Sequence, residues 1–503
     1  MKIKVQELMD ACGVKFGTSG ARGLAVQMTD RVCYLYTKGF IQHLEAIGDL
    51  RSPGREVAVA GDLRPSTERI MAAVRRAVQD MHYAPVNCGR IPSPAVALYG
   101  LARSIPAVMV TGSHIPADRN GIKFNKCSGE ILKADEEGIR RQEVEVAEGQ
   151  FDAAGFFAGK ARPHWPVRAE AQEAYVARYH DVFPATALSG KRIGVYQHSA
   201  VGRELLVRIL GGLGAETIKL GFSDEFVPVD TEAIRPEDAR LAAEWTRRYR
   251  LDAIASTDGD SDRPLISDET GAWLRGDVAG ILCARFLEAD SVSTPVSSNT
   301  AVEKCGCFAE VRRTRIGSPY VVASMLEASD RGARRVVGYE ANGGFLTNSD
   351  LQLGRRILRA LPTRDAVLPI VSILLLAARE RKTLSQLLAE LPARYTASDR
   401  LRDFPQQQSR AVLNRFTTGN QASDRRAIEA VFGAESGQVA TIDRTDGIRI
   451  TFASGEIVHL RPSGNAPEFR CYNEAASPER ATRLNTRCLE LIRKVSAGGL
   501  GFP

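Results

Sequence analysis

Short apolar strands, polar turns and amphipathic helices alternate along this chain, and this alternation constrains the fold more than any other feature. Strands are predicted at Glu56–Ala60, Ala107–Val110, Arg192–Tyr196, Thr217–Leu220 and Val336–Gly338. Helices are predicted from Ser66, as an N-terminal cap, to about Gln79, and from Arg203 to Leu213. Alternating strands and helices indicate α/β domains with parallel or mixed sheets, in which ligands bind beyond the carboxyl ends of the strands.

Beyond about residue 400 the pattern changes to one of hairpins. Arg444–Phe452 and Glu456–Leu460 predict two strands joined by a turn at residues 453–455, Glu468–Tyr472 predicts another strand, and Ala481–Val495 predicts a final helix. This region is expected to form a smaller α+β domain. The chain has 503 residues, and domains usually span ~100–200 residues, so three or four domains are expected, with boundaries near 165–187, 292 and 400.

The composition excludes several classes of protein. Residues 1–30 lack the apolar core of a secretion signal, and no run is long enough to span a bilayer; the most apolar stretch, Val367–Ala378, predicts a buried helix. Nine cysteines without paired spacing indicate reduced thiols in a cytoplasm, and the lone C-x-C of Cys305 and Cys307 is weak evidence for zinc. The net charge of +7 comes from basic residues interleaved with acids, which does not favour nucleic-acid binding.

Three carboxylates alternate in the loop S-T-D-G-D-S-D-R-P, at Asp258, Asp260 and Asp262, and Arg263 follows directly. Oxygen ligands of this kind suit Mg²⁺, and a guanidinium beside them suits an anionic ligand such as a phosphate. Two alternatives remain: a solvated acidic turn, and an EF-hand calcium loop with Glu269 at position twelve. The second lacks the required glycine at position six, and its flanks predict strands.

A serine on a tight turn follows the strand Ala107–Val110, in the segment T-G-S-H-I-P. Ser113 could act as a nucleophile or phosphate carrier, with His114 or Lys123 as a proton-transfer group, although an ordinary turn serine is the commoner case. The loop Arg461–Asn465, with Arg470 beyond it, offers donors that suit a phosphate, as does F-G-T-S-G-A-R-G, which contains Arg22. Gly61–Ser66 fits either a phosphate-facing turn or the start of a helix.

These motifs occur in a specific order. F-G-T-S-G-A-R-G, T-G-S-H-I-P with N-G-I-K, D-G-D-S-D-R, G-Y-E-A-N-G-G and R-P-S-G-N begin near residues 16, 111, 258, 338 and 461. The chain thereby resembles the α-D-phosphohexomutase family, which moves phosphate between the 1 and 6 positions of a hexose. The resemblance implies three related α/β domains and a C-terminal α+β domain around a central cleft, at residues 1–165, 166–292, 293–400 and 401–503.

The resemblance also implies a role for each motif. Ser113 matches the family's phosphoserine, and Ser113 with Asp258, Asp260 and Asp262 matches the ligands of Mg²⁺. The catalytic set implied is Ser113, His114, Lys123, Arg22 and Arg263. The substrate-binding set implied is Gly317, Glu340, Asn342, Arg461, Ser463, Gly464, Asn465 and Arg470. A hexose 1,6-bisphosphate is expected as activator, with small hexose phosphates as substrates and a monomer or homodimer as the functional state.

Four positions depart from the family pattern. Ile115, Asn342 and Asn465 replace an asparagine, a serine and a threonine, and Gly344 stands where many relatives have a histidine that assists proton transfer. The general base is therefore expected to be Lys123 or His114. The sugar loop favours the phosphomannomutase branch, with a phosphoglucomutase or dual-specificity enzyme as the alternative and a phosphoglucosamine mutase less favoured. A non-catalytic sugar-phosphate binding protein and a metal-dependent phosphohydrolase are the alternatives from other classes.

Overall fold

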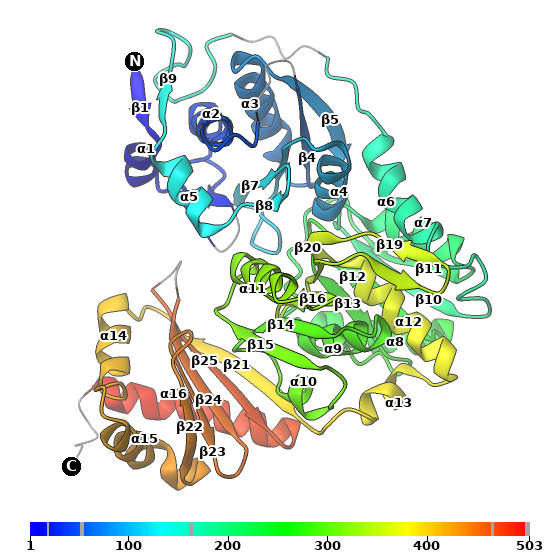
Figure 1. Ribbon diagram of the computed structural model, residues 1–503, viewed down its shortest axis with the longest axis vertical. Coiled ribbons are helices and arrows are strands. Elements are labelled where there is room, and N and C mark those ends of the chain that lie inside the picture. The colour runs from blue at the N-terminus through cyan, green and yellow to red at the C-terminus, as the bar shows by residue number, and fades with distance from the viewer. Residues whose placement is uncertain (18–19, 51–54, 160–163, 464–466, 498–503) are drawn as a thin grey trace. The chain divides into compact units, whose positions relative to one another are not determined.

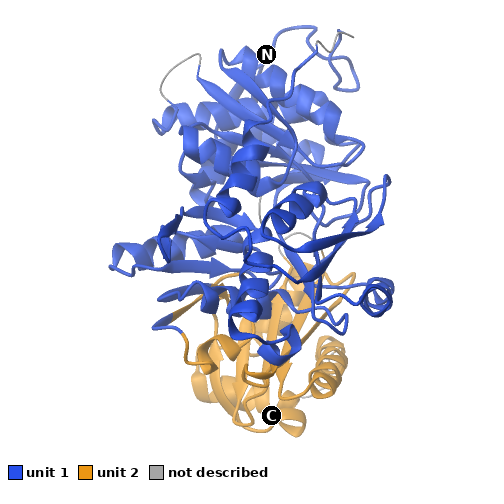
Figure 2. Cartoon of the chain, turned by 90° about the vertical axis from the view of Figure 1, so that its right-hand side faces the viewer, with its two compact units in different colours: residues 1–293, 308–310, 317–388 blue, residues 294–307, 311–316, 389–503 orange. Residues whose placement is uncertain are grey.

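The chain folds into two compact units, which Figure 2 colours blue and orange. The computed structural model describes residues 1–17, 20–50, 55–159, 164–463 and 467–497. The first unit comprises residues 1–293, 308–310 and 317–388, and the second comprises residues 294–307, 311–316 and 389–503. No helix within the described ranges combines the length and the apolar character that crossing a membrane requires.

The first sheet of the first unit has the strand order β2-β3-β7-β6-β4-β5, and β8 pairs with β7; Figure 1 labels β4, β5, β7 and β8 of this sheet. Its strands are β2 (Lys15–Phe16), β3 (Ala21–Leu24), β4 (Glu56–Gly61), β5 (Ala84–Arg90), β6 (Ala107–Val110), β7 (Arg119–Lys126) and β8 (Gly129–Glu130). A separate antiparallel pair joins β1 (Lys2–Lys4) to β9 (Glu143–Glu145). The helices are α1 (Val5–Cys12), α2 (Asp30–Ala46), α3 (Thr67–Asp80), α4 (Ser93–Arg103) and α5 (Lys133–Arg140). Parallel pairing of β4 with β5 and β6 confirms two predicted strands.

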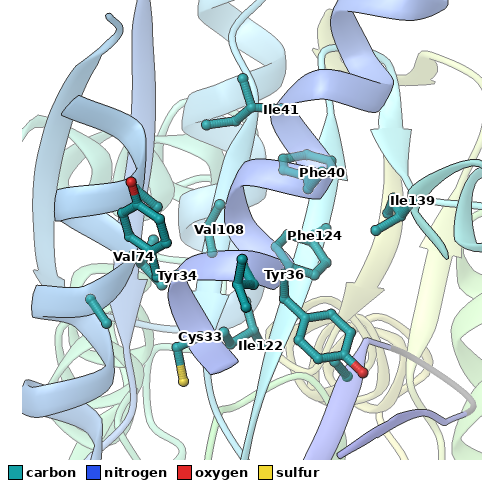
Figure 3. Close-up of a cluster of buried hydrophobic side chains, with 14 of the residues drawn as sticks. Cys33, Tyr34, Tyr36, Phe40, Ile41, Val74, Val108, Ile122, Phe124 and Ile139 are labelled. Atoms are coloured by element: carbon teal, nitrogen blue, oxygen red, sulfur yellow. The ribbon is translucent and has the colours of Figure 1, made fainter. Parts of the chain in front are cut away.

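The core beneath this sheet forms around α2, a helix that is buried on nearly all sides. Phe40 of α2 stacks on Phe124 of β7 with ring centroids 4.6 Å apart, and Figure 3 shows Val74 of α3 and Ile139 of α5 in the same cluster. Burying an aromatic side chain of this size contributes roughly 2–3 kcal/mol. This packed core supports the strands whose ends carry the polar loops.

One predicted contact at the start of α3 is wrong. Ser66 precedes the helix, but its backbone is helical and its side chain makes no capping hydrogen bond. The Ser66 hydroxyl instead accepts a hydrogen bond from Asn120 Nδ2, at 2.8 Å. The helix itself, to Asp80, is as expected.

The second sheet has the order β11-β10-β12-β13, with β13 antiparallel to β12. Its strands are β10 (Arg192–His198), β11 (Glu216–Phe222), β12 (Ala253–Thr257) and β13 (Pro264–Ser267), and its helices are α6 (Glu170–His180), α7 (Arg203–Gly212) and α8 (Pro236–Tyr249). The strands and the helix predicted here are confirmed. The three-aspartate loop is the connection between β12 and β13.

The third sheet places its strands β14, β16, β17 and β20 in that order. These are β14 (Ser291–Pro295), β16 (Val336–Tyr339), β17 (Phe345–Thr347) and β20 (Leu361–Asp365), and a small ribbon joins β18 (Leu351–Leu353) to β19 (Arg356–Leu358). The helices are α9 (Gly276–Phe286), α11 (Ser318–Asp330), α12 (Val367–Glu380) and α13 (Leu384–Ala389). As predicted, α12 is buried along nearly its whole length.

The second unit is built on an antiparallel sheet of order β21-β25-β24-β23-β22 (Figure 1). Its strands are β21 (Tyr395–Leu401), β22 (Val439–Asp443), β23 (Ile448–Phe452), β24 (Ile457–Pro462) and β25 (Phe469–Ala475). The helices are α10 (Ala301–Lys304), α14 (Gln406–Asn414), α15 (Gln421–Ser436) and α16 (Pro478–Ser496), and β15 spans Glu310–Thr314. The predicted hairpin and final helix are confirmed.

One strand boundary in this unit differs from the prediction. The strand expected from Arg444 begins only at Ile448, because residues 444–447 form the turn that joins β22 to β23. Gly447 has φ = 74°, a left-handed conformation that glycine adopts without strain, and Asp443 accepts a hydrogen bond from the backbone N–H of Thr445. Residues 444–447 are polar and end in Asp446-Gly447, a turn signal that the prediction of a strand from Arg444 did not take into account.

Candidate active site

The aspartate loop lies between two strands and buries all three carboxylates. One oxygen each from Asp258, Asp260 and Asp262 lies within 4.8 Å of the others, and no second group of this kind occurs among the described residues. The flanking strands exclude an EF-hand, and the Glu269 carboxylate accepts hydrogen bonds from the hydroxyl and backbone N–H of Ser385. Because the three side chains are buried, the solvated-turn alternative is also excluded.

Two of these carboxylates each keep one oxygen without a donor. Asp260 Oδ2 accepts hydrogen bonds from Lys123 Nζ at 2.6 Å and Ser93 Oγ at 2.5 Å. Asp262 Oδ2 accepts hydrogen bonds from Lys123 Nζ at 2.5 Å and Arg364 Nε at 3.0 Å. The Oδ1 atoms of Asp260 and Asp262 are buried and accept no hydrogen bond from any described residue. Unpartnered buried oxygens of this kind fit a hard divalent cation such as Mg²⁺.

The charges around the loop shift the pKa values of its three carboxylates in different directions. Burial, with Asp260 and Asp262 close by, raises the pKa of Asp258 well above its ordinary value. Burial would also raise the pKa of Asp260, but the Lys123 ammonium lowers it. For Asp262 the Arg364 guanidinium overcomes burial in the same way and lowers the pKa. The raised pKa of Asp258 reflects carboxylates crowded together in a buried place, and a bound cation would relieve that repulsion.

Ser113 meets this loop from the end of β6. Its Oγ donates a 2.7 Å hydrogen bond to Asp258 Oδ2, and His114 Nδ1 lies 3.4 Å from the same Oγ. Ser113 is fully buried and has φ = 58°, a conformation that costs a non-glycine residue about 1–3 kcal/mol. Its backbone N–H donates to Thr111 Oγ1 at 2.7 Å, which helps to hold that conformation. Its burial, its left-handed backbone and its contact with Asp258 together distinguish Ser113 from an ordinary turn serine.

Arg64 supports the Ser113 loop, a role that the sequence did not reveal. The loop Gly61–Ser66 was expected to face a phosphate or to start a helix, and the helix start is what the structure contains. The Arg64 guanidinium is buried against Asp62, with Nε 3.1 Å from Asp62 Oδ2, and stacks on the Phe226 ring at 4.0 Å. Its nitrogens donate to backbone carbonyls of the serine loop, those of Ser113, Ile115, Pro116 and Arg119.

Further cations converge on the same place. Arg263 Nε lies 3.7 Å from Asp262 Oδ1, and Nε atoms of both Arg22 and Arg263 are buried and donate to no described residue. Burial, together with nearby Arg263, lowers the pKa of Arg22 to about 10. Burial and the same two arginines hold the pKa of His114 well below its ordinary value. Buried guanidinium N–H groups without a hydrogen-bond acceptor suit a doubly charged phosphate.

The Glu340 loop joins the aspartate loop through Arg364, which sequence reasoning missed. Arg364 Nη1 lies 3.0 Å from Glu340 Oε2, and its Nη2 lies 2.9 Å from Asp262 Oδ2. Asn342 is expected to contact a sugar. In the structure its side-chain oxygen accepts a hydrogen bond from the backbone N–H of Gly344, at 3.0 Å. A lone arginine in the segment T-R-D carries no motif, so only its contacts identify it.

The remaining predicted residues fall into two groups. Gly317, with φ = 133°, precedes α11 in the first unit, whereas Arg461, Ser463 and Arg470 lie in the second unit. Arg461 and Arg470 are directly opposed on β24 and β25, and Arg461 Nε donates to Asp446 Oδ1 at 2.9 Å. Ser463 is buried and donates its backbone N–H to the carbonyl of Glu468. Gly464 and Asn465 lie outside the described residues.

Comparison with family models covers most of the chain. Residues 13–148, 173–271 and 275–395 match domains I, II and III, each described as an alpha/beta/alpha domain of phosphoglucomutase/phosphomannomutase. Residues 413–491 match the C-terminal domain of the same group. The fold is therefore three α/β/α domains followed by a distinct C-terminal domain.

Known proteins with similar sequences lead to the same family as these family models. A phosphomannomutase of Sinorhizobium fredii is 43% identical over 480 residues, covering 95% of this chain and 99% of the relative. A phosphomannomutase of Salmonella muenchen is 42% identical over 487 residues, with 97% of each chain covered. A solved phosphoglucomutase/phosphomannomutase family protein of Burkholderia thailandensis has the same fold, with a TM-score of 0.73 at 18% identity over 97% of this chain and 98% of that one.

Proposed function

The chain belongs to the phosphoglucomutase/phosphomannomutase family, and from this we propose that it interconverts mannose 6-phosphate and mannose 1-phosphate. The two phosphomannomutases at 42–43% identity over nearly the whole chain support the choice of mannose over other hexoses. The observation that carries the chemistry is the 2.7 Å hydrogen bond from Ser113 Oγ to Asp258 Oδ2, within the buried cluster of three carboxylates. A phosphate carrier and a cation site at one point are what phosphoryl transfer requires.

Ser113, Asp258, Asp260 and Asp262 are the residues that would hold Mg²⁺. The unpartnered Oδ1 atoms of Asp260 and Asp262 support this assignment. When bound, the ion supplies positive charge that neutralises the transferring phosphoryl group. Arg22 and Arg263 would add fixed positive charge beside the transferring phosphoryl group.

The reaction proceeds through a phosphorylated enzyme and a bisphosphorylated sugar. Phosphorylated Ser113 transfers its phosphoryl group to the free hydroxyl of a hexose monophosphate: the bond from phosphorus to Ser113 Oγ breaks, and a bond to the sugar oxygen forms. The hydroxyl proton passes to a base. The resulting hexose 1,6-bisphosphate reverses its orientation and returns its other phosphate to Ser113, so the same compound, added in catalytic amount, regenerates the active enzyme.

His114 is the better candidate for proton exchange with Ser113. Lys123 donates its ammonium protons to Asp260 and Asp262, whereas His114 Nδ1 lies 3.4 Å from Ser113 Oγ, where the phosphoryl group arrives and departs. A group that exchanges a proton must reach the reacting oxygen directly or through one water, so this distance favours the histidine at the Ser113 oxygen, whereas the sugar hydroxyl attacks in line from the opposite side of phosphorus. Lys123 then stabilises the carboxylates rather than exchanging protons.

Substrate recognition is assigned to three segments. Glu340 and Asn342 would bind the sugar hydroxyls, with Gly317 shaping a loop that influences sugar preference. The phosphate that is not transferred would bind in the second unit to Arg461, Ser463, Gly464, Asn465 and Arg470. The proposal also includes domain boundaries at residues 165, 292 and 400. It further includes a monomeric or homodimeric state and a cytoplasmic location. The partners are small hexose phosphates, with neither nucleic acid nor membrane involved.

A coupled assay tests the proposal. Purified protein with Mg²⁺ and catalytic hexose 1,6-bisphosphate is given mannose 1-phosphate, glucose 1-phosphate and glucosamine 1-phosphate in parallel, and Ser113→Ala is compared with wild type. Fastest turnover of the mannose compound, lost in Ser113→Ala, is the expected result. Preference for the glucose or glucosamine compound would reassign the substrate. Phosphate release without isomerisation would indicate a phosphohydrolase, and binding without turnover a binding protein.

A further inference from the structure

Arg364 is a fully buried arginine that joins three parts of the first unit. It extends from the end of β20 and donates to Asp262 Oδ2 through Nε at 3.0 Å. Its Nη1 donates to Glu340 Oε2 at 3.0 Å and to Ser318 Oγ at 3.2 Å. Ser318 in turn donates to Glu130 Oε2 at 2.7 Å. One guanidinium therefore contacts the metal loop, the sugar loop and the helix that follows Gly317.

The backbone that carries Arg364 is itself anchored. The next residue, Asp365, accepts hydrogen bonds from the hydroxyls of Tyr175, at 2.6 Å, and Tyr179, at 2.5 Å, both on α6. The preceding residue, Thr363, donates to Glu130 Oε1 at 2.6 Å. The position of the guanidinium is thus fixed from both sides, which is what a residue needs if it is to orient others.

The stem of Arg364 also explains the glycine at position 344. A Cβ atom built on Gly344 would lie 2.6 Å from Arg364 Cδ, 2.8 Å from Cγ and 3.1 Å from Cβ. These contacts involve the root of the arginine side chain, which cannot swing away as its tip could. A side chain at position 344 and an arginine at position 364 therefore exclude each other.

We propose that Arg364 is a positioning residue that fixes Glu340 and Asp262 relative to each other, and that position 344 is glycine to make room for it. The inference rests on the proposed function, because Asp262 is assigned there to the metal and Glu340 to the sugar. Arg364 donates to Oδ2 of Asp262, and Oδ1, which accepts no hydrogen bond from a described residue, is the oxygen that would bind the cation. Its planar fork reaches both carboxylates together, which a lysine with a single nitrogen cannot do.

The first test compares Arg364→Lys with Arg480→Lys. Arg480 bridges Glu435 and Glu456 in the second unit, so its variant controls for loss of a double ion pair elsewhere. Mn²⁺ serves as the metal probe, its Kd measured by calorimetry, and KM and kcat are measured with mannose 1-phosphate. Arg364→Lys is expected to raise the Mn²⁺ Kd about 10-fold or more and to raise KM, as loss of an outer-shell partner does. A Kd and KM equal to those of Arg480→Lys would overturn the proposal.

The second test uses Gly344→Ala with and without the arginine stem. Gly344→Ala alone is expected to raise the Mn²⁺ Kd and KM in the same direction as Arg364→Lys, because the new methyl group displaces the stem. In an Arg364→Ala background, where Cγ and Cδ are absent, Gly344→Ala should add little. Equal effects of Gly344→Ala in both backgrounds would overturn the proposal; if Arg364→Ala fails to fold, the two single variants decide. Wild type that binds Mn²⁺ but turns over no hexose phosphate would defeat the proposed function alone, since the Kd comparison stands without turnover.

Discussion

Ser113 Oγ donates a 2.7 Å hydrogen bond to Asp258 Oδ2, although 145 residues separate the two in the chain. Arg64 Nη2 donates to the carbonyl of Ser113 at 2.8 Å, and Gly259 also approaches this carbonyl closely. A Cβ atom built on Gly259 would lie 2.7 Å from the Ser113 carbonyl oxygen and 3.0 Å from Phe226 Cζ. The serine loop and the aspartate loop therefore pack backbone against backbone, with no room for a side chain between them.

Gly259→Ala is expected to separate Ser113 from Asp258, because the methyl group must push the serine loop away. A displacement of about 1 Å at reacting groups can lower kcat by about 10²-fold, and overpacking costs about 1–3 kcal/mol of folding free energy. Steady-state kinetics and urea unfolding measure the two effects. Gly211→Ala on α7 is the control, since a Cβ there meets nothing within 4 Å. Equal kcat in the two variants would contradict the close approach.

Arg64→Met is expected to lower the free energy of unfolding by about 3–5 kcal/mol, because it leaves the buried Asp62 carboxylate without its partner. Asp62→Asn combined with Arg64→Met should recover part of that stability. It should not recover kcat, since the carbonyls of Ser113 and Ile115 still lose their donor. Urea unfolding and the mutase assay on the single and double variants separate these effects. Full recovery of kcat in the double variant would show that Arg64 only balances the charge of Asp62.

Mg²⁺ is expected to raise the melting temperature of wild type and to leave that of Asp260→Asn nearly unchanged. A ligand at 100 times its Kd stabilises the folded state by about 2.7 kcal/mol, and the loss of one buried carboxylate removes most of the affinity. Differential scanning calorimetry with and without Mg²⁺ measures the shift. The exposed Asp224, replaced in Asp224→Asn, is the control for lost surface charge. An equal shift in Asp260→Asn would place the ion elsewhere.

Acid is expected to destabilise the second unit through His459. Its Nε2 lies 2.7 Å from the carbonyl oxygen of Asp446, so that nitrogen carries the proton, and its buried Nδ1 has no partner among the described residues. Burial lowers the pKa of His459 from 6.5 to about 4. Between these values the unfolded chain binds more protons, so the stabilisation present above pH 6.5 is lost as the pH falls toward 4, by about 1 kcal/mol per pH unit.

His459→Gln tests this, because glutamine Nε2 can donate to the same carbonyl but does not titrate. Urea unfolding at neutral pH and at about pH 5 should show that this variant loses less free energy of unfolding in acid than wild type does. His164→Gln, at an exposed site, should retain the wild-type loss. An identical pH dependence in wild type and His459→Gln would assign the acid sensitivity to other groups.

The parts of the site that sequence could predict are local. Asp258, Asp260 and Asp262 alternate directly after an apolar strand, and Ser113 follows another, so strand periodicity alone predicted that both sets lie at strand ends. The roles assigned to these residues remain predictions, as do the domain boundaries. Boundaries of single elements were less certain: the start of the strand expected from Arg444 was wrong, because the polar residues 444–447, with Gly447 at φ = 74°, form a turn.

The parts that sequence could not predict depend on contacts between distant segments. Arg364 lies 102 residues from Asp262, and Arg64 lies 49 residues from Ser113; each is a single arginine among 67 basic residues and carries no motif. Ser93 is a further example, since its bond to Asp260 spans 167 residues. Nothing local distinguishes a buried arginine that orders a site from an exposed one on a helix.

The sequence by itself determined most element types, the α/β class and the position of the three-aspartate and serine loops at strand ends, because periodicity is a property of neighbouring residues. Only the tertiary structure decided which carboxylate oxygens remain without donors, which arginines fix the two loops, and why position 344 is glycine. Those properties follow from burial, where a missing donor or an extra methyl group costs free energy that solvent would otherwise remove.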